Sequence, residues 1–561
     1  MFFKKIKIIF ICLLFYQSPS LSKSNSLNNF DSNNLSKYFS GIVAFDNRDN
    51  ATALDYFNSS KILLNRHDPY LEKFIMSLVL ENKVSQAINI IKINRNKLNS
   101  NFFEAYILLI LDSLKKNNLD QAIQILSEIP QFLQKDRFNF IILKSLKQYL
   151  YVFKEKKIMN SEENFGNFTL INETFQRCYL SDENTSSHFS NLINNSKADY
   201  SRYIYFYLTH LIENNNFKEA ETITNEIDYI GSTLLISQGK SWVESKEFKK
   251  FNEVFSCKDY NHLIGEFLFL ISNIYSSQDE FKKSNFFLNF SIFLNPKFIF
   301  NLSLIVENLY LNENYEKAKE VLINFENEED FYYWYRIKKE SHIVSKTKNQ
   351  DEGLDYIISK FKKIENPNNK FIFDVANYYK NSKRYNEAIK YYSEIIDSLD
   401  ENLLLKSDLL YRRGGSYERL KDYENADKDL LHSLKINPDN AYVLNYLAYS
   451  WLERNYKINE AIQMLEKAYE MESNDPYIID SIGWAYYLID DFIKAEEFLK
   501  RAVELMPDDP IVNDHYGDIL WELDRKIQAR YFWLMVLEME NVEKDLIDQI
   551  NDKLIIGPEK S

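Results

Sequence analysis

The 561-residue sequence contains little cysteine, proline or glycine: 3 Cys, 10 Pro and 11 Gly. So few glycines argue against folds that depend on Gly-rich phosphate loops, and the scarcity of both glycine and proline argues against β-rich folds with many tight turns. Cys178 and Cys257 have no short spacing typical of a zinc site or a redox motif. An exported chain could pair them, but we expect them to be buried as small apolar residues. Long helices joined by short polar corners fit this composition best.

Basic residues are also fewer than acidic residues. The 68 basic residues are outnumbered by 82 acidic ones, which gives a net charge of −14. Electrostatic repulsion makes nucleic acid and anionic lipid surfaces poor partners, so a basic or neutral partner is favoured. Apolar residues make up 45% of the chain, which is enough for a large core and argues against disorder throughout.

The motifs that carry catalysis are missing. The sequence has no Walker loop, no dinucleotide-binding glycine fingerprint, no His-Glu-x-x-His zinc helix and no Gly-x-Ser-x-Gly elbow. His515 lies close to Asp514 and Asp518, but a third metal ligand cannot be named, and a hydrogen bond at the start of a helix explains the group equally well. We expect no catalytic residue, metal or cofactor, and no small-molecule substrate is evident. The chain is therefore predicted not to be an enzyme.

The first 22 residues are predicted to be a secretory signal peptide. Three lysines precede a nine-residue apolar run over 8–16, and small residues allow cleavage near Ser22. The run is short for a membrane-spanning helix, although an uncleaved anchor is an alternative. A lipoprotein site at Cys12 is disfavoured because Ile11 stands where such a site needs a small residue. Residues 23–36, rich in Ser and Asn, are expected to form a flexible tether. We therefore expect a periplasmic or otherwise exported protein.

Small residues recur with one period along the C-terminal third of the chain. One series has steps of 34, 35 and 34 residues: Gly414, Ala448, Gly483 and Gly517. A second has steps of 35, 34 and 34: Ala426, Ala461, Ala495 and Ala529. Two antiparallel helices need a small residue where their axes approach, and a large residue one turn later fills the space beside it. Those large residues are Leu430, Leu465, Leu499 and Trp533.

This pattern resembles the tetratricopeptide repeat, a 34-residue helix-turn-helix unit. The residues that match are Gly414, Tyr417, Ala426 and Pro438, and then Gly483, Tyr486, Ala495, Ala502 and Pro507. The resemblance implies an all-α fold, a right-handed α-α superhelix built as a solenoid of antiparallel helix pairs.

The same period runs through most of the chain. We expect N-terminal repeats over 37–130, degenerate or irregular helical repeats over 131–200, central repeats over 201–400, a clear array over 401–540 and a capping helix with a tail over 541–561. The 98 residues that separate Ala122 from Ala220 are close to three periods, so three repeats are expected there. The stack is expected to form a ribbon of hairpins with no separate closed domain.

In the tetratricopeptide family, particular positions of each first helix point into a concave groove that holds peptide segments. The resemblance carries these positions onto thirteen residues: Asp408, Tyr411, Glu418, Tyr442, Asn445, Tyr449, Tyr477, Asp480, Trp484, Tyr487, Asp514, Asp518 and Trp521. Aromatic and acidic side chains alternate in this set and favour Lys or Arg on the ligand. The family's carboxylate clamp, which grips a free C-terminus, is disfavoured because no Lys accompanies Asn445.

We therefore expect an exported, non-catalytic scaffold or adaptor that binds proteins or peptides with basic or aromatic segments. The chain is similar to long exported tetratricopeptide proteins of Gram-negative bacteria, some of which deliver cell-wall hydrolases to a carboxy-terminal processing protease. This likeness implies a role in envelope protein turnover or assembly. One alternative is a repeat arm of a polysaccharide-export or outer-membrane secretion machine. The other is an enzyme whose site lies within 131–200. Membrane contact is expected only through partners or an uncleaved signal.

Overall fold

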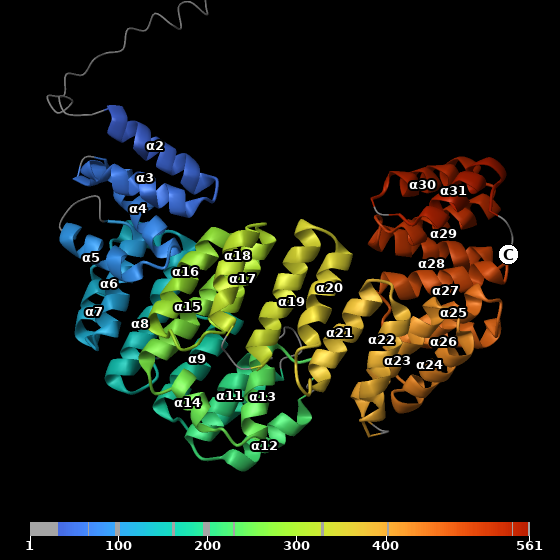
Figure 1. The fold of residues 1–561 in the computed structure, drawn as a ribbon, viewed down its shortest axis with the longest axis horizontal. Helices are drawn as coiled ribbons and strands as arrows, with labels where there is room; N and C mark the ends of the chain where they lie inside the picture. The colour runs from blue at the N-terminus through green and yellow to red at the C-terminus, as the bar shows by residue number, and fades with distance from the viewer. Residues whose placement is uncertain are drawn as a thin grey trace, which may run out of the picture. The chain divides into compact units, whose positions relative to one another are not determined.

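All regular elements of the chain are helical in the computed structural model, which describes residues 32–65, 67–95, 101–159, 163–194, 202–227, 230–326, 330–400, 403–540 and 542–558 (Figure 1). None of these described residues lies in a β-strand, and consecutive helices pack against one another. The predicted all-α stack of helix pairs is confirmed. The predicted signal peptide lies outside the described residues. Within the described ranges, no helix has the length and apolar character needed to span a membrane.

The chain divides into two compact units. Unit 1 holds the described residues up to Glu226, together with Thr233–Asn324. Its α-helices are α2 (Ser32–Asp46), α3 (Asn50–Ser59), α4 (Asp68–Leu80), α5 (Val84–Asn94), α6 (Phe103–Lys115), α7 (Leu119–Ser127), α8 (Arg137–Glu155), α9 (Asn167–Leu180), α10 (Thr185–Ile193), α11 (Arg202–Glu213), α12 (Phe217–Glu226), α13 (Leu234–Glu244), α14 (Lys249–Val254), α15 (Tyr260–Ser276), α16 (Phe281–Leu294), α17 (Asn301–Leu311) and α18 (Tyr315–Leu322). Because α2 begins at Ser32, the last five residues of the predicted tether are helical.

Unit 2 holds Ile227–Ser232 and the chain from Phe325 onward. Its α-helices are α19 (Asp330–Thr347), α20 (Gln350–Phe361), α21 (Asn369–Asn381), α22 (Tyr385–Asp397), α23 (Leu404–Arg419), α24 (Tyr423–Ile436), α25 (Ala441–Glu453), α26 (Ile458–Met471), α27 (Pro476–Leu488), α28 (Phe492–Leu505), α29 (Pro510–Glu522), α30 (Lys526–Glu538) and α31 (Lys544–Ile556). A helix, α31, thus stands where a capping helix was predicted.

The periodic small residues lie at the crossings of paired helices, as predicted. A Cβ atom added at Gly483 would lie 2.7 Å from Leu499 Cγ, and one at Gly414 would lie 3.0 Å from Leu430 Cγ. Gly517 faces the indole of Trp533 in the same way. A larger side chain at these glycines would push the two helices of a pair apart.

Side chains at the turns fix where each helix of the clear array begins. The first helices α25, α27 and α29 are N-capped by Asn440, Asp475 and Asp509, each of which accepts hydrogen bonds from two backbone N–H groups of the first turn. Within a pair, the turn passes through a residue with positive φ, such as Asp490 at 62° or Asp524 at 60°. Asn and Asp tolerate this conformation better than most residues, so polar turns replace glycine here.

Helices of unit 1 also contact one another across large separations in the sequence. Helices α15 and α16 pack back against α4, α5, α6, α8 and α9 (Figure 1). Asn289 Nδ2 donates to the carbonyl of Val79 at 2.8 Å, and the rings of Tyr149 and Phe267 lie 5.7 Å apart. Both helices are apolar on most faces, and such helices are stable only when they are surrounded. These contacts between helices far apart in the sequence add to the predicted stack of helix pairs and were not part of the prediction.

The stretch predicted to hold irregular repeats is largely helical where it is described. It contains η4 (Gln131–Gln134), α8, α9 and α10. The described residues between Ala122 and Ala220 form four α-helices, fewer than the five that three repeat periods require. The prediction of three repeats is wrong because α8 runs for 19 residues and uses more chain than a repeat helix allows.

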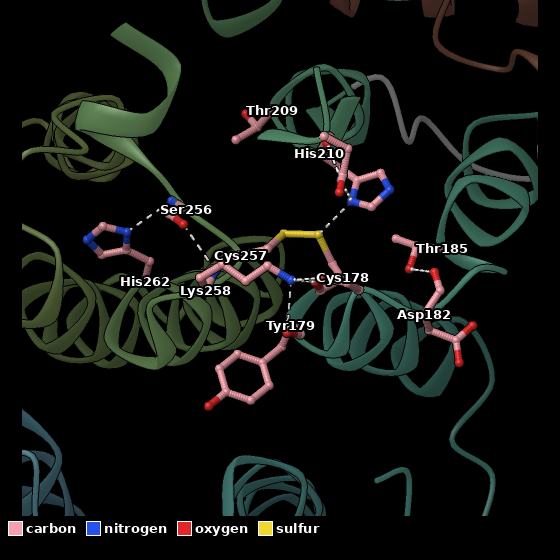
Figure 2. The surroundings of a disulfide bond; sticks show 12 residues. Cys178, Tyr179, Asp182, Thr185, Thr209, His210, Ser256, Cys257, Lys258 and His262 are labelled. Atoms are coloured by element: carbon pink, nitrogen blue, oxygen red, sulfur yellow. Dashed lines mark hydrogen bonds between the residues drawn. A yellow bond between two sulfur atoms is a disulfide. The ribbon is translucent and has the colours of Figure 1, made fainter. Parts of the chain in front are cut away.

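A disulfide joins Cys178 to Cys257 across 79 residues, in unit 1 (Figure 2). Our expectation of two separate buried thiols is therefore wrong, because the return of the chain at α15 brings the two residues together. Both cysteines are fully buried. His210 Nδ1 lies 3.5 Å from Cys178 Sγ, and burial followed by the charge of Lys258 lowers the pKa of His210 to about 4. Lys258 Nζ donates to the carbonyls of Cys178 and Tyr179 at 3.1 Å, which adds a second tie between the same segments.

Candidate functional site

The thirteen residues predicted to bind a partner lie on the first helices α23, α25, α27 and α29. Helix α27 contacts both α25 and α29, so these three form one continuous surface, which we call the first-helix face. Its side chains range from fully buried to more than half exposed. The structure therefore separates the predicted residues into those that hold the repeats together and those that a partner can reach.

Three rings are stacked at the centre of the first-helix face. The Trp484 ring lies 4.7 Å from Tyr487 and 4.1 Å from His515, with an interplanar angle of 12° in both pairs. His515 Nδ1 donates to Asp480 Oδ2 at 2.9 Å. Burial lowers the pKa of His515, but Asp480 and the carboxylates of Asp514 and Asp518 raise it by more, so the net shift is upward. Five of these residues belong to the predicted groove set, whereas His515 was considered only as a metal ligand or a hydrogen-bonding group at the start of a helix.

Asp514 and Asp518 bind a cation from their own chain. Lys553, on α31, lies 2.7 Å from Asp514 Oδ1 and 2.8 Å from Asp518 Oδ2. Burial and then Asp514 raise the pKa of Asp518 to about 7, against the opposing effect of Lys553. The two carboxylates are 5% and 2% exposed, so they do not form an open acidic surface.

Four of the predicted groove residues are buried: Asp480, Tyr487, Asp514 and Asp518. The prediction that they line an open groove is wrong, because each one contacts a neighbouring helix. No spacing in the sequence shows these contacts, since Lys553 comes from a helix that was predicted only as a cap. The basic and aromatic neighbours that the sequence does not predict are Arg412, Tyr446 and Lys553, and the bond from His515 to Asp480 is likewise seen only in the structure.

The predicted residues on α23 make hydrogen bonds and ring contacts with Arg412 on the same helix and Tyr446 on α25. Asp408 accepts from Arg412 Nε at 2.8 Å, and Tyr446 donates its hydroxyl to Glu418 at 3.0 Å. The ring of Tyr411 packs edge-on against Tyr446 at 5.6 Å. All of these side chains keep part of their surface in solvent.

Two tyrosines of the predicted set are more than half exposed. Tyr442 is 54% exposed and Tyr477 is 53% exposed, at equivalent positions of α25 and α27. Three further aromatic residues of the predicted set, Tyr449, Trp484 and Trp521, are half-buried. Burial, followed by the charge of Glu453, raises the pKa of Tyr449 well above its usual value, so this hydroxyl is a neutral donor at physiological pH.

Several polar atoms of the first-helix face are buried without a hydrogen-bond partner among the described residues. They include Asn445 Oδ1, Asp480 Oδ1 and the indole nitrogen of Trp484. Nothing in the described part of the chain groups three or more His, Cys, Asp or Glu side chains so that they could hold a metal ion. The chemistry of this face is thus aromatic contact, hydrogen bonding and attraction of positive charge.

Comparison with known proteins identifies the repeats. A model of the tetratricopeptide repeat matches residues 370–398 and 407–440, which correspond to the α21–α22 and α23–α24 pairs. The chain therefore carries tetratricopeptide repeats, as the resemblance predicted. Repeats of this kind are in general non-catalytic scaffolds that bind protein partners.

Individual relatives match only parts of the chain. TPR repeat-containing protein PA4667 of Pseudomonas aeruginosa is 35% identical over 91 residues, which are 16% of this chain and 15% of that protein. A solved tetratricopeptide repeat protein from Parabacteroides merdae is 14% identical, with a TM-score of 0.36 over 52% of this chain and 98% of the solved one. A thermophilic tetratricopeptide repeat protein of Thermus thermophilus is 18% identical, with a TM-score of 0.30 over 34% of this chain and 100% of its own.

Proposed function

We propose that the chain is an exported, non-catalytic scaffold that binds a protein segment on the first-helix face of unit 2. The observation that carries this proposal is the pair Tyr442 and Tyr477, more than half exposed at equivalent positions of neighbouring first helices. Tyrosine and tryptophan provide a large contact area at a small cost in conformational entropy, and they dominate protein interfaces for that reason.

The partner segment carries lysine or arginine. Half-buried aromatic rings lie on this face, and the face of such a ring attracts a lysine or arginine side chain. Asp514 and Asp518 already accept a lysine from the chain itself, which supports the assignment of an ammonium or guanidinium ligand. The net charge of −14 favours the same class of partner at long range.

The site of action is the cell envelope. The apolar segment over 8–16, preceded by three lysines, supports export. A buried disulfide is typical of proteins in oxidising compartments. A scaffold in that compartment suits envelope protein turnover or assembly, including the delivery of substrates to a processing protease. The protein itself contributes binding and orientation, and no chemical step is assigned to its residues.

The test is a crosslinking pull-down from envelope extract with a doubly substituted chain, Tyr442→Ala with Tyr477→Ala. Loss of partner capture with an unchanged melting temperature supports the proposal. The matched control is Tyr531→Ala, which removes a 60% exposed tyrosine from α30, away from the first-helix face. If both variants capture partners as the unsubstituted chain does, the first-helix face is not the binding surface.

A further inference from the structure

The C-terminal helix α31 reaches the carboxylates that the sequence predicts as ligands for a partner's cation. Lys553 Nζ lies within 2.8 Å of both Asp514 Oδ2 and Asp518 Oδ2. Burial lowers the pKa of Lys553, but the two carboxylates raise it by more, so the side chain is held as an ammonium. The position of this ammonium is the one that a basic ligand of the first-helix face would take.

The end of α31 also covers the last aromatic residue of the predicted set. A Cβ atom added at Gly557 would fall within 2.6 Å of Trp521 Cζ2, so the backbone lies directly on the indole ring. Arg530 donates to the carbonyl of Leu554 at 3.2 Å and places its guanidinium 4.9 Å from the centre of the same ring. One helix therefore covers Asp514, Asp518 and Trp521 together.

Helix α31 is held by few apolar contacts for its length. Only Leu546 and Ile550 are buried, and eight of its thirteen residues are exposed. In α29, by contrast, only Ile511 is exposed among thirteen residues. The salt bridge from Lys383 to Glu543, just before α31, joins two exposed side chains and contributes little to stability. Elements with few buried contacts open at a low free-energy cost.

We propose that α31 is an intramolecular ligand that reversibly occupies the α29 end of the first-helix face, with Lys553 in the place of a partner's lysine or arginine. This inference rests on the proposed function, since it assigns a regulatory element to the same face. A partner with a basic helical segment displaces α31, and the apparent affinity for that partner is reduced by the fraction of chains in which α31 is docked.

Two full-length variants test this inference with a labelled synthetic peptide of residues 542–558 as the probe. Ile550→Ala removes the most buried anchor of α31 and leaves Lys553 and both carboxylates in place. Ile555→Ala is the matched control, because Ile555 lies on the same helix and is 76% exposed. We expect the Ile550→Ala chain to bind the peptide at least about tenfold more tightly than the unsubstituted chain does, and the Ile555→Ala chain to match the unsubstituted chain.

The role of the cation is tested by a second peptide that carries Lys553→Glu. This peptide should bind no variant, because it would place a third carboxylate beside Asp514 and Asp518. Hydrogen exchange on the full chain gives an independent readout: amides of α31 should exchange faster than those of α29, and faster still in the Ile550→Ala chain. Protection of α29 shows that the variant remains folded.

Equal peptide binding by the two variants, or protection of α31 as strong as that of α29, would overturn the inference. These results do not depend on the envelope partner. If the peptide experiments succeed while the Tyr442→Ala, Tyr477→Ala chain still captures partners, the proposed function fails, and only the reversible docking of α31 on α29 stands, without a regulatory role. If the peptide experiments fail while the Tyr442→Ala, Tyr477→Ala chain loses partner capture, the proposed function stands and α31 is not its regulator.

Discussion

His515 and Asp480 connect two neighbouring first helices through a buried hydrogen bond of 2.9 Å between residues 35 positions apart. Asp480 lies on α27 and His515 on α29, so the bond joins one repeat to the next. Trp484 covers the imidazole ring and keeps water from the contact. This pair lies where the sequence predicts ligand contacts, and it shows that part of the first-helix face serves the stacking of repeats.

The His515 contact makes stability depend on pH. The pKa of His515 is raised in the folded chain, so its contribution is fully present below the unfolded pKa of about 6.5 and is lost as the pH rises through the folded value. Denaturant unfolding of the unsubstituted chain and of His515→Gln at about pH 5.5 and about pH 9 measures this effect. The difference in free energy of unfolding between the two chains should shrink at the higher pH. A difference that does not change with pH contradicts the assignment.

Asp518 acts on stability in the same direction. Its pKa, raised to about 7 by burial and Asp514, means that the folded chain keeps a proton which the unfolded chain loses near pH 4. The free energy of unfolding therefore falls as the pH rises from about 4 to about 7. Asp518→Asn removes this titration and should give a shallower pH dependence. Asp524→Asn, at an exposed position on the next turn, should keep the slope of the unsubstituted chain.

The disulfide stabilises unit 1 by restricting its unfolded state. A cross-link that spans 79 residues contributes about 4.5 kcal/mol in the chain-entropy model. Cys178→Ala with Cys257→Ala should lower the free energy of unfolding of unit 1 by a similar amount in denaturant titrations. Reduction of the unsubstituted chain should shift its transition to that of the variant. A transition that is insensitive to reductant would show that the two thiols are not paired in solution.

Gly483→Ala should destabilise unit 2. The new methyl group would lie 2.7 Å from Leu499 Cγ, and overpacking of this kind costs about 1–3 kcal/mol, more than alanine gains in helix propensity. Gly415→Ala is the control, because its methyl group would meet only the hydroxyl end of Tyr446, at 3.3 Å. Thermal melting should place the control at or above the unsubstituted chain and Gly483→Ala below it.

Arg202 and Glu266 form a buried ion pair in unit 1. Arg202 donates two hydrogen bonds to Glu266, at 2.9 and 2.7 Å, and its guanidinium lies 3.7 Å from the centre of the Phe269 ring. Glu266→Gln leaves a largely buried cation without its counter-charge and should cost about 3–5 kcal/mol of stability. Glu352→Gln breaks the exposed pair with Lys348 and should cost less than about 1 kcal/mol. Similar losses for both variants would contradict this account.

The helix pairs of unit 2 follow from local sequence. The crossing of two helices needs small residues where the axes approach and a large residue one turn later, and Gly483, Ala495 and Leu499 meet these needs within one repeat. Such contacts join residues that are close along the chain, so they leave a periodic signal. The return of α15 and α16 onto earlier helices depends on contacts between residues about 200 positions apart, such as Asn289 with Val79, which leave no period.

The amino-acid sequence by itself determined the helical class, the repeat length and the first helices that carry the exposed aromatic residues, because a repeating pattern records contacts within and between adjacent repeats. Only the tertiary structure decided that Cys178 pairs with Cys257, that His515 bonds to Asp480 and that Lys553 forms salt bridges with Asp514 and Asp518. Each of these contacts joins residues that are far apart in the sequence, so it depends on the tertiary fold. The same fold sets how burial and neighbouring charges together shift the pKa of each side chain.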